Sequence, residues 1–169
     1  MNAKLIAVAA WSAAGLLGSM VTCPVPALGD QSTLMGMLPQ GFSSGNCHQQ
    51  SAKPPALEKV NCDQSTDANG PTAAVFALYA NADALTTGFQ SAGNDVTVSS
   101  NCPGNQESPG PWTYSNNQVG GQVECGTMGG DNNAAVAVVV WTDNSKMRAA
   151  AVQGPDISAL YQWWKTKSG

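Results

Sequence analysis

Positive charge and histidine are both scarce in this sequence. Its 169 residues include seven lysines and arginines, eleven aspartates and glutamates, and one histidine, so the formal net charge is −4. Proteins that bind nucleic acid or anionic membrane surfaces do so through clustered Lys and Arg side chains. The sequence contains no such cluster, and we therefore expect neither nucleic acid nor a membrane surface among its partners.

Recognisable metal and cofactor motifs are also lacking. The five cysteines form no CxxC pair, which is the spacing typical of zinc sites. Residues 67–70 (DANG) resemble the middle of a calcium-binding loop, but the ligands required at the two ends of that loop are missing. We therefore predict no metal site and no cofactor.

The few matches to catalytic motifs are weak. Residues 41–45 (GFSSG) match the GxSxG pattern of a nucleophile elbow, which would make Ser43 the nucleophile. No buried strand is predicted before this segment, and His48 follows too closely to serve as its base, so a turn is the favoured interpretation. A hydrolase that uses Ser43 or a pair of carboxylates is kept as an alternative. The carboxylate candidates are Glu58, Asp63, Asp83, Asp95, Glu107, Glu124 and Asp143.

The N-terminus has the organisation of a secretory signal. A short basic start precedes an apolar run over residues 5–21, and small-residue cleavage patterns end at Ala27 and at Gly29. We expect residues 1–27 to be a signal peptide, with Gly29 as the second possible cleavage site. The alternatives are an uncleaved membrane anchor and lipidation at Cys23, because the residues before Cys23 have the shape of a lipobox.

The cysteine count agrees with cleavage. Removing the leader takes away Cys23 and leaves an even set of four, which in an exported chain indicates a disulfide framework. Four cysteines allow three pairings. We favour Cys47–Cys62 and Cys102–Cys125, because each pair closes a local loop of polar, glycine- and proline-rich chain that would not hold its shape unaided.

Hydrophobic periodicity predicts a series of strands and two helices. The helices are expected over residues 82–92 and from Pro155 onward, where apolar side chains recur at helical spacing. Because the connections are short, we expect an α+β fold: an antiparallel sheet with two helices packed on one face, and two disulfides. The predicted strands cover residues 56–62, 72–80, 95–99, 112–114, 121–125, 134–142 and 147–153.

The mature chain is long enough for one domain. Residues 28–45 are rich in Gly, Ser and Met and only weakly periodic, which predicts a flexible N-terminal segment. Residues 46–169 are then expected to form a single disulfide-stapled α+β domain, because such a length is typical of one domain.

Aromatic side chains supply the candidates for a binding surface. Most rings in a small domain with few large aliphatic side chains belong to the core, and Trp141 and Trp164 lie on predicted core faces. Trp112 and Trp163 are the hardest to bury, and Tyr114 lies close to Trp112 in the sequence. An exposed aromatic pair would suit stacking on a sugar or on a partner surface. Trp112, Tyr114 and Trp163 are therefore the candidate binding residues.

A series of short segments between residues 38 and 164 carries a family resemblance. They are 38–41 (LPQG), 60–62 (VNC), 70–71 (GP), the strand that ends at Tyr79, 102–104 (CPG), 112–114 (WTY), 125–126 (CG), 140–142 (VWT), 153–156 (QGPD) and 160–164 (LYQWW). Together these segments resemble a family of small exported proteins from mycobacteria and their relatives. Similar segments occur in the extracytoplasmic parts of some bacterial serine/threonine kinases.

The resemblance implies a compartment and a fold but no chemistry. The chain has no glycine-rich nucleotide loop after a strand, no His-Arg-Asp catalytic loop and no Asp-Phe-Gly motif, so kinase activity is not implied. We expect a non-catalytic, sensor-type module that is secreted or held in the cell envelope and that binds an envelope ligand or protein. An envelope hydrolase and a structural wall-associated protein are the alternatives. After signal cleavage, membrane attachment would require the lipid at Cys23.

Export predicts a defined mature N-terminus. Mass spectrometry of the exported protein should show a chain that begins at Leu28 or at Asp30, because the cleavage patterns end just before these residues. Loss of Lys4 with the leader leaves a formal net charge of −5. An acylated chain beginning at Cys23 would show the lipidated form instead, and a chain that keeps Met1 would contradict cleavage.

Overall fold

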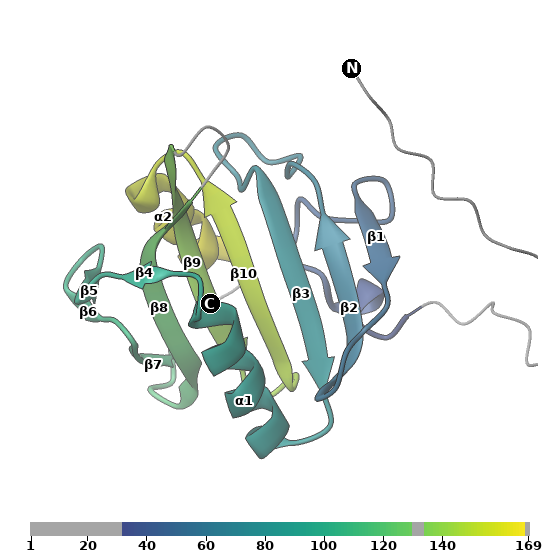
Figure 1. Ribbon diagram of the computed structural model, residues 1–169. Helices are drawn as coiled ribbons and strands as arrows, with labels where there is room; N and C mark the ends of the chain where they lie inside the picture. The colour runs from purple at the N-terminus through teal and green to yellow at the C-terminus, as the bar shows by residue number, and fades with distance from the viewer. Residues whose placement is uncertain (1–31, 130–133, 168–169) are drawn as a thin grey trace, which may run out of the picture. The chain divides into compact units, whose positions relative to one another are not determined.

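The computed structural model describes residues 32–129 and 134–167 (Figure 1). The predicted signal peptide, its two cleavage sites and Cys23 lie outside the described residues. Within the described part, no helix is long and apolar enough to cross a membrane.

The main element is an eight-stranded antiparallel sheet. Its strand order is β1-β2-β3-β10-β9-β8-β4, and β7 pairs with β8 beside β4. A separate two-stranded ribbon joins β5 and β6. In chain order the elements are η1 (Met35–Met37), β1 (Cys47–Gln50), β2 (Ala56–Cys62), β3 (Ala73–Tyr79), α1 (Ala82–Gly93), β4 (Thr97–Val98), β5 (Asn101–Cys102), β6 (Gln106–Glu107), β7 (Gly110–Thr113), β8 (Val119–Gly129), β9 (Ala135–Asp143), β10 (Arg148–Gly154) and α2 (Ile157–Lys167).

The expected fold class is confirmed, and so is the expected cysteine pairing. The protein is α+β, with an antiparallel sheet and two helices. Cys47–Cys62 joins directly opposed residues of β1 and β2, with an S–S distance of 2.08 Å. Cys102–Cys125 joins β5 to β8, with an S–S distance of 2.02 Å. Each bond therefore ties an element with few apolar side chains to a longer strand.

The two helices lie on opposite faces of the sheet, so the prediction that they share one face is wrong. Side chains alternate between the faces along a strand. In β9, Trp141 points toward α2, where its ring centroid lies 6.2 Å from that of Trp164. Val140 points the other way and clusters with Phe89 of α1. Figure 1 shows α1 in front of the sheet and α2 behind it. Because β9 is apolar on both faces, each face requires a helix.

The described part of the predicted flexible segment 28–45 packs into the core. Leu34 has no solvent exposure, and its N–H donates to Oε2 of Glu58 over 2.9 Å. The guanidinium of buried Arg148 donates to a carbonyl of η1. Residues 32–45 are therefore packed against the domain by buried and hydrogen-bonded groups, which their weak periodicity did not indicate.

Side chains cap the N-termini of both helices. Asn81 precedes α1, and its Oδ1 accepts from the N–H of Ala84 over 2.9 Å. At α2 the cap is Asp156, whose Oδ1 accepts from the N–H of Ala159 over 2.7 Å. The second helix begins at Ile157 rather than at Pro155, because Asp156 occupies the capping position.

A close contact between α1 and β3 gives a stability test. A Cβ added at Gly88 would overlap the ring of Tyr79. Ala normally stabilises a helix relative to Gly, but here overpacking should dominate, and Gly88→Ala should lower the free energy of unfolding by about 1–3 kcal/mol. Denaturant or thermal unfolding measures this change. Gly36→Ala is the matched control, since a Cβ there meets no atom within 4 Å; equal stability of the two variants would contradict the contact.

Candidate ligand-binding groove

The two tryptophans predicted to be exposed are both buried. Trp112 is 3% exposed and Trp163 is 5% exposed. The indole N–H of Trp112 donates to the carbonyl of Thr142 over 2.8 Å, and that of Trp163 donates to Oδ2 of Asp67 over 3.0 Å. Burial of a tryptophan is favourable when its N–H finds an acceptor, and both acceptors come from distant parts of the chain. The expectation of an exposed aromatic pair is therefore wrong.

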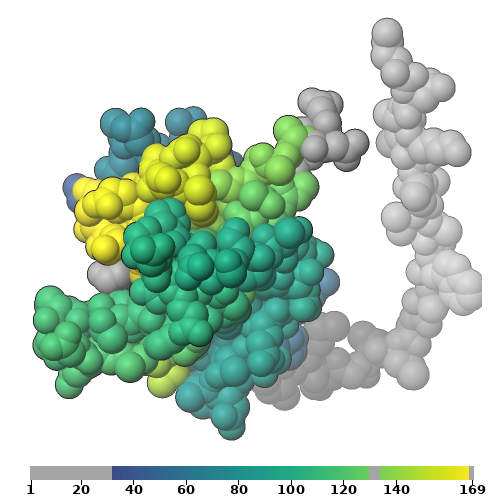
Figure 2. Space-filling model, turned by 90° about the vertical axis from the view of Figure 1, so that its left-hand side faces the viewer, coloured from purple at the N-terminus to yellow at the C-terminus, as the bar shows by residue number. Residues whose placement is uncertain are grey.

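The structure brings Trp112 and Tyr114 together but not Trp163. The rings of Trp112 and half-buried Tyr114 meet edge to face, with centroids 4.7 Å apart. With Tyr161 and Trp164 they line a pocket of about 430 Å³ between α2 and the turn after β7. Figure 2 shows that turn (green) below α2 (yellow). Trp163 packs elsewhere, against Phe42. Trp164 is as buried as Trp112, so a molecule in the pocket would contact little of the indole ring of either residue.

A buried ionic cluster closes the β9–β10 hairpin. Asp143 and Arg148 are directly opposed in the sheet, and Oδ2 of Asp143 lies 3.8 Å from Arg148 Nη2 and 2.8 Å from Lys146 Nζ. Burial acts to raise the pKa of Asp143, but hydrogen bonds from Lys146 and Ser145 and the charges of Lys146 and Arg148 overcome it, and the pKa is lowered. The hydroxyl of Tyr114 also donates to Asp143 Oδ1. These partners make the cluster a structural anchor.

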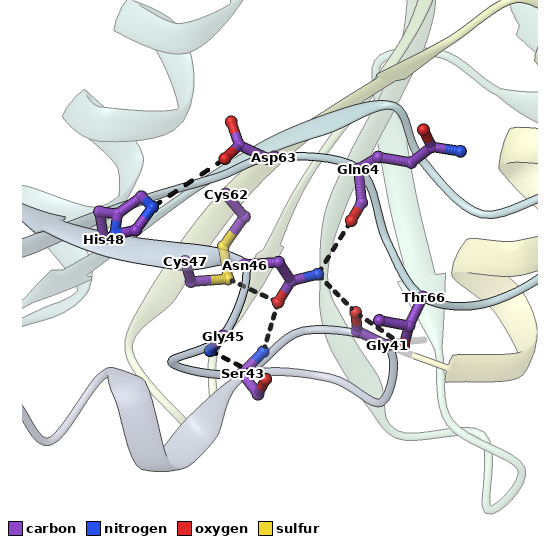
Figure 3. The surroundings of a disulfide bond; sticks show 10 residues. All are labelled: Gly41, Ser43, Gly45, Asn46, Cys47, His48, Cys62, Asp63, Gln64 and Thr66. Atoms are coloured by element: carbon purple, nitrogen blue, oxygen red, sulfur yellow. Dashed lines mark hydrogen bonds and ion pairs between the residues drawn. A yellow bond between two sulfur atoms is a disulfide. The ribbon is translucent and has the colours of Figure 1, made fainter.

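Ser43 and His48 do not form a catalytic pair. Ser43 lies in a turn organised by Asn46, whose Oδ1 accepts from the Ser43 N–H over 2.9 Å. His48 instead faces Asp63, with 3.9 Å between Nε2 and Oδ2 (Figure 3). Figure 3 places the turn and His48 on different sides of the Cys47–Cys62 disulfide. No hydrogen bond links Ser43 to His48 in the described chain. The interpretation of residues 41–45 as a turn agrees with this geometry.

The buried carboxylates lie apart from one another. Asp143 belongs to the ionic cluster on the α2 face, whereas Glu124 lies on the α1 face, opposite Val140 and against Gly93. Glu58 accepts hydrogen bonds from residues of the N-terminal segment. Among residues 32–129 and 134–167, no three His, Cys, Asp or Glu side chains are placed to hold a metal ion.

An open, mostly apolar groove lies beside α1, and we call it the α1 groove. It has a volume of about 410 Å³, within the range of about 300–1,000 Å³ that is usual for small-molecule sites. Its floor is the sheet face formed by Val75 and Ala77 of β3 and Ala149 and Ala151 of β10. These side chains are small, and Val75 is 36% exposed, so solvent reaches the floor of the groove.

The walls of the α1 groove come from α1 and from the β1–β2 connection. The helix contributes its smallest side chains, Gly88, Ser91 and Ala92. The opposite wall is formed by Pro54 and Pro55 in the loop between β1 and β2. On this face α1 packs on β9, β10 and β3 and has a smaller contact with β2, and the groove runs along the side of the helix.

Two lysines give the α1 groove its charge. Lys53 is exposed in the proline-containing loop, and Lys59 lies opposite Ala77 on β2. Of the ion pairs in the described part of the chain, none includes Lys53 or Lys59. In a chain with a net negative charge, this groove therefore combines apolar surface with local positive charge.

The groove residues were not identified from the sequence. The available signal was a pair of alanine-rich strands, β3 and β10, in which alternate positions on one face are Ala or Val. Alanine at alternate strand positions is compatible with tight packing as well as with an open floor, since the outcome depends on what covers it. Only the position of α1 shows that these alanines form an open floor and not a tightly packed layer.

Glu124 gives a pH test of the α1 face. Burial raises the pKa of its carboxyl, and Oε1 has no hydrogen-bond partner among the described residues. The contribution of the protonated form to stability is present at low pH and is lost as pH rises through the raised pKa. Glu124→Gln should therefore raise the melting temperature at pH 7 and change it little at pH 4.

Thermal unfolding between pH 4 and pH 7.5 measures this difference. The matched control is Glu107→Gln, which removes the same charge from an exposed position. Its melting temperature should depend on pH in the same way as that of the wild type. A destabilised Glu124→Gln variant at pH 7 would show that the carboxylate has a favourable partner and would contradict the assignment.

Comparison with known proteins does not place the chain in a family. No protein-family model matches the sequence, no curated protein matches it, and no solved structure matches the fold. The geometry of the α1 groove is therefore the main structural indication of function.

Proposed function

We propose that this chain is an exported, non-catalytic binding module and that the α1 groove is its ligand site. The observation that carries the proposal is the open floor of Val75, Ala77 and Ala151 beside two lysines that have no acidic partner in the described chain. Ligand sites are typically concave and mostly apolar, with a few polar groups that orient the ligand. The α1 groove has this composition.

Export is supported by the disulfides and by the predicted leader. Cys47–Cys62 and Cys102–Cys125 would persist in an oxidising compartment, and disulfides are rare in reducing ones. The resemblance to extracytoplasmic kinase segments adds the idea of a sensor-type module, in which ligand binding outside the cell is the function. The secreted and envelope-held forms are both compatible with this proposal.

The two alternative functions have less support. A hydrolase would need Ser43 beside a base or two carboxylates about 5–10 Å apart in a cleft, but Ser43 lies in the Asn46 turn, and Glu124 and Asp143 lie on opposite faces of the sheet. A purely structural wall protein would have no reason to keep an apolar groove open, because exposed apolar surface favours association.

The test is to map a neutral apolar probe onto the protein. N-phenyl-1-naphthylamine added to the ¹⁵N-labelled disulfide-intact protein should shift amide resonances on β3, β10 and the second half of α1. Val75→Trp should fill the groove and weaken probe binding at least tenfold, because the indole occupies the exposed floor position.

The matched control is Val98→Trp, which places the same ring on an exposed valine of β4 that does not line the groove. This variant should bind the probe as the wild type does. Resonance shifts concentrated on the Tyr114–Tyr161 pocket, or unchanged probe affinity in Val75→Trp, would contradict the assignment of the α1 groove as the ligand site.

A further inference from the structure

We propose that the α1 groove binds a linear amphiphile with one carboxylate, a long-chain fatty acid anion. The alkyl chain would lie on the alanine floor, and the carboxylate would lie between Lys53 and Lys59. This inference rests on the proposed function of the groove and names the chemical class of its ligand.

The shape and lining of the groove favour an unbranched alkyl chain. The floor consists of Val75, Ala77 and Ala151, whose side chains carry no hydrogen-bonding groups. The facing helix wall is Gly88, Ser91 and Ala92. The Ser91 hydroxyl donates to the carbonyl of Thr87 within the helix. Among the described residues that line the groove, Tyr79 is the single aromatic one, and it is buried and packed against Gly88. A sugar would need stacking faces and many hydrogen-bond partners, whereas a methylene chain needs only apolar contact.

The charge in the groove favours a single anionic head. Lys53 and Lys59 both belong to the β1–β2 side of the groove, so the positive charge lies along one edge while the rest of the floor is apolar. This separation matches a molecule that is charged at one end and apolar along the remainder. Lysine ammonium groups act as point charges and can pair with a single carboxylate without a fixed bidentate geometry.

The position of α1 also favours a carboxylate over a phosphate. Phosphate sites commonly use the N–H groups at a helix N-terminus, but the α1 residues that line the groove are Gly88, Ser91 and Ala92, in the C-terminal half of the helix. That end of a helix carries partial negative charge and adds no anion-binding N–H groups. Two lysines therefore provide all the charge that a ligand head would meet.

Titration calorimetry with saturated fatty acids tests the inference. The disulfide-intact protein is titrated with C10, C12 and C14 carboxylates below their micelle concentrations, and with the neutral alcohols of equal length. Each added methylene should tighten binding about twofold to fourfold, since an open groove buries part of each group. The carboxylate should bind more tightly than the alcohol of the same length.

Variants of the two lysines test the contribution of the carboxylate head separately from that of the alkyl chain. Lys53→Gln/Lys59→Gln should weaken carboxylate binding about threefold to twentyfold and leave alcohol binding unchanged. The matched control is Lys165→Gln/Lys167→Gln, which removes the same charge from the end of α2, on the other face of the sheet. The control should keep the wild-type preference for the carboxylate, and circular dichroism verifies that each variant is folded.

The outcomes distinguish this inference from the proposed function. Equal affinity for alcohols and carboxylates, or an equal loss in both lysine variants, would overturn the anionic head while leaving the groove as the ligand site. An affinity that does not change with the length of the alkyl chain would overturn the proposal of an alkyl ligand. The naphthylamine mapping would still report whether the groove binds apolar molecules. Loss of all binding in Val75→Trp, together with carboxylate preference in the wild type, is the expected result.

Discussion

Strand β9 is apolar on both faces, and the layers of the molecule follow from that constraint. Because its side chains alternate, Trp141 can be buried only by a cover on one side and Val140 only by a cover on the other. Helix α2 and the N-terminal segment provide the first cover, and α1 provides the second. Leaving either face open would expose several side chains whose burial contributes about 1.5–3 kcal/mol each.

The two covers differ in the size of the side chains they meet. On the α2 face, Phe76, Trp141 and Trp164 fill the space with rings in edge-to-face or tilted contact. On the α1 face, the strand positions that line the groove carry the small side chains of Val75, Ala77, Ala149 and Ala151. The part of the helix beside them also has small side chains, Gly88, Ser91 and Ala92. The ring-filled face therefore forms the continuous core, and the alanine face leaves room for the α1 groove.

Polar and covalent links secure the parts that apolar packing does not. The cluster of Asp143 and Arg148 joins the β9–β10 turn to η1 through the carbonyl of Met37, so the N-terminal segment is held across the α2 face. The disulfides join β1 and β5, which bury little apart from their cysteines, to β2 and β8. The scaffold around the groove is thus tied at its edges as well as packed at its centre.

Local patterns in the sequence determined most elements of this fold. The strand over Ala56–Cys62, the helix that begins after Asn81, the hairpin of β9 and β10 and the pairing of cysteines across short loops depend on neighbours that are near in sequence. Propensity, capping and loop closure act over such distances, and for that reason these features were predictable.

Only the tertiary structure decided which faces are covered. Trp112 is buried because Thr142, thirty residues away, accepts its N–H, and Trp163 is buried because Asp67 does the same from ninety-six residues away. The groove over Ala77 and Ala151 exists because α1 meets this part of the sheet with small side chains, which leave the space unfilled. Burial is a property of the contacts between elements, and the hydrophobic pattern of one element does not specify which neighbour will cover it or how completely.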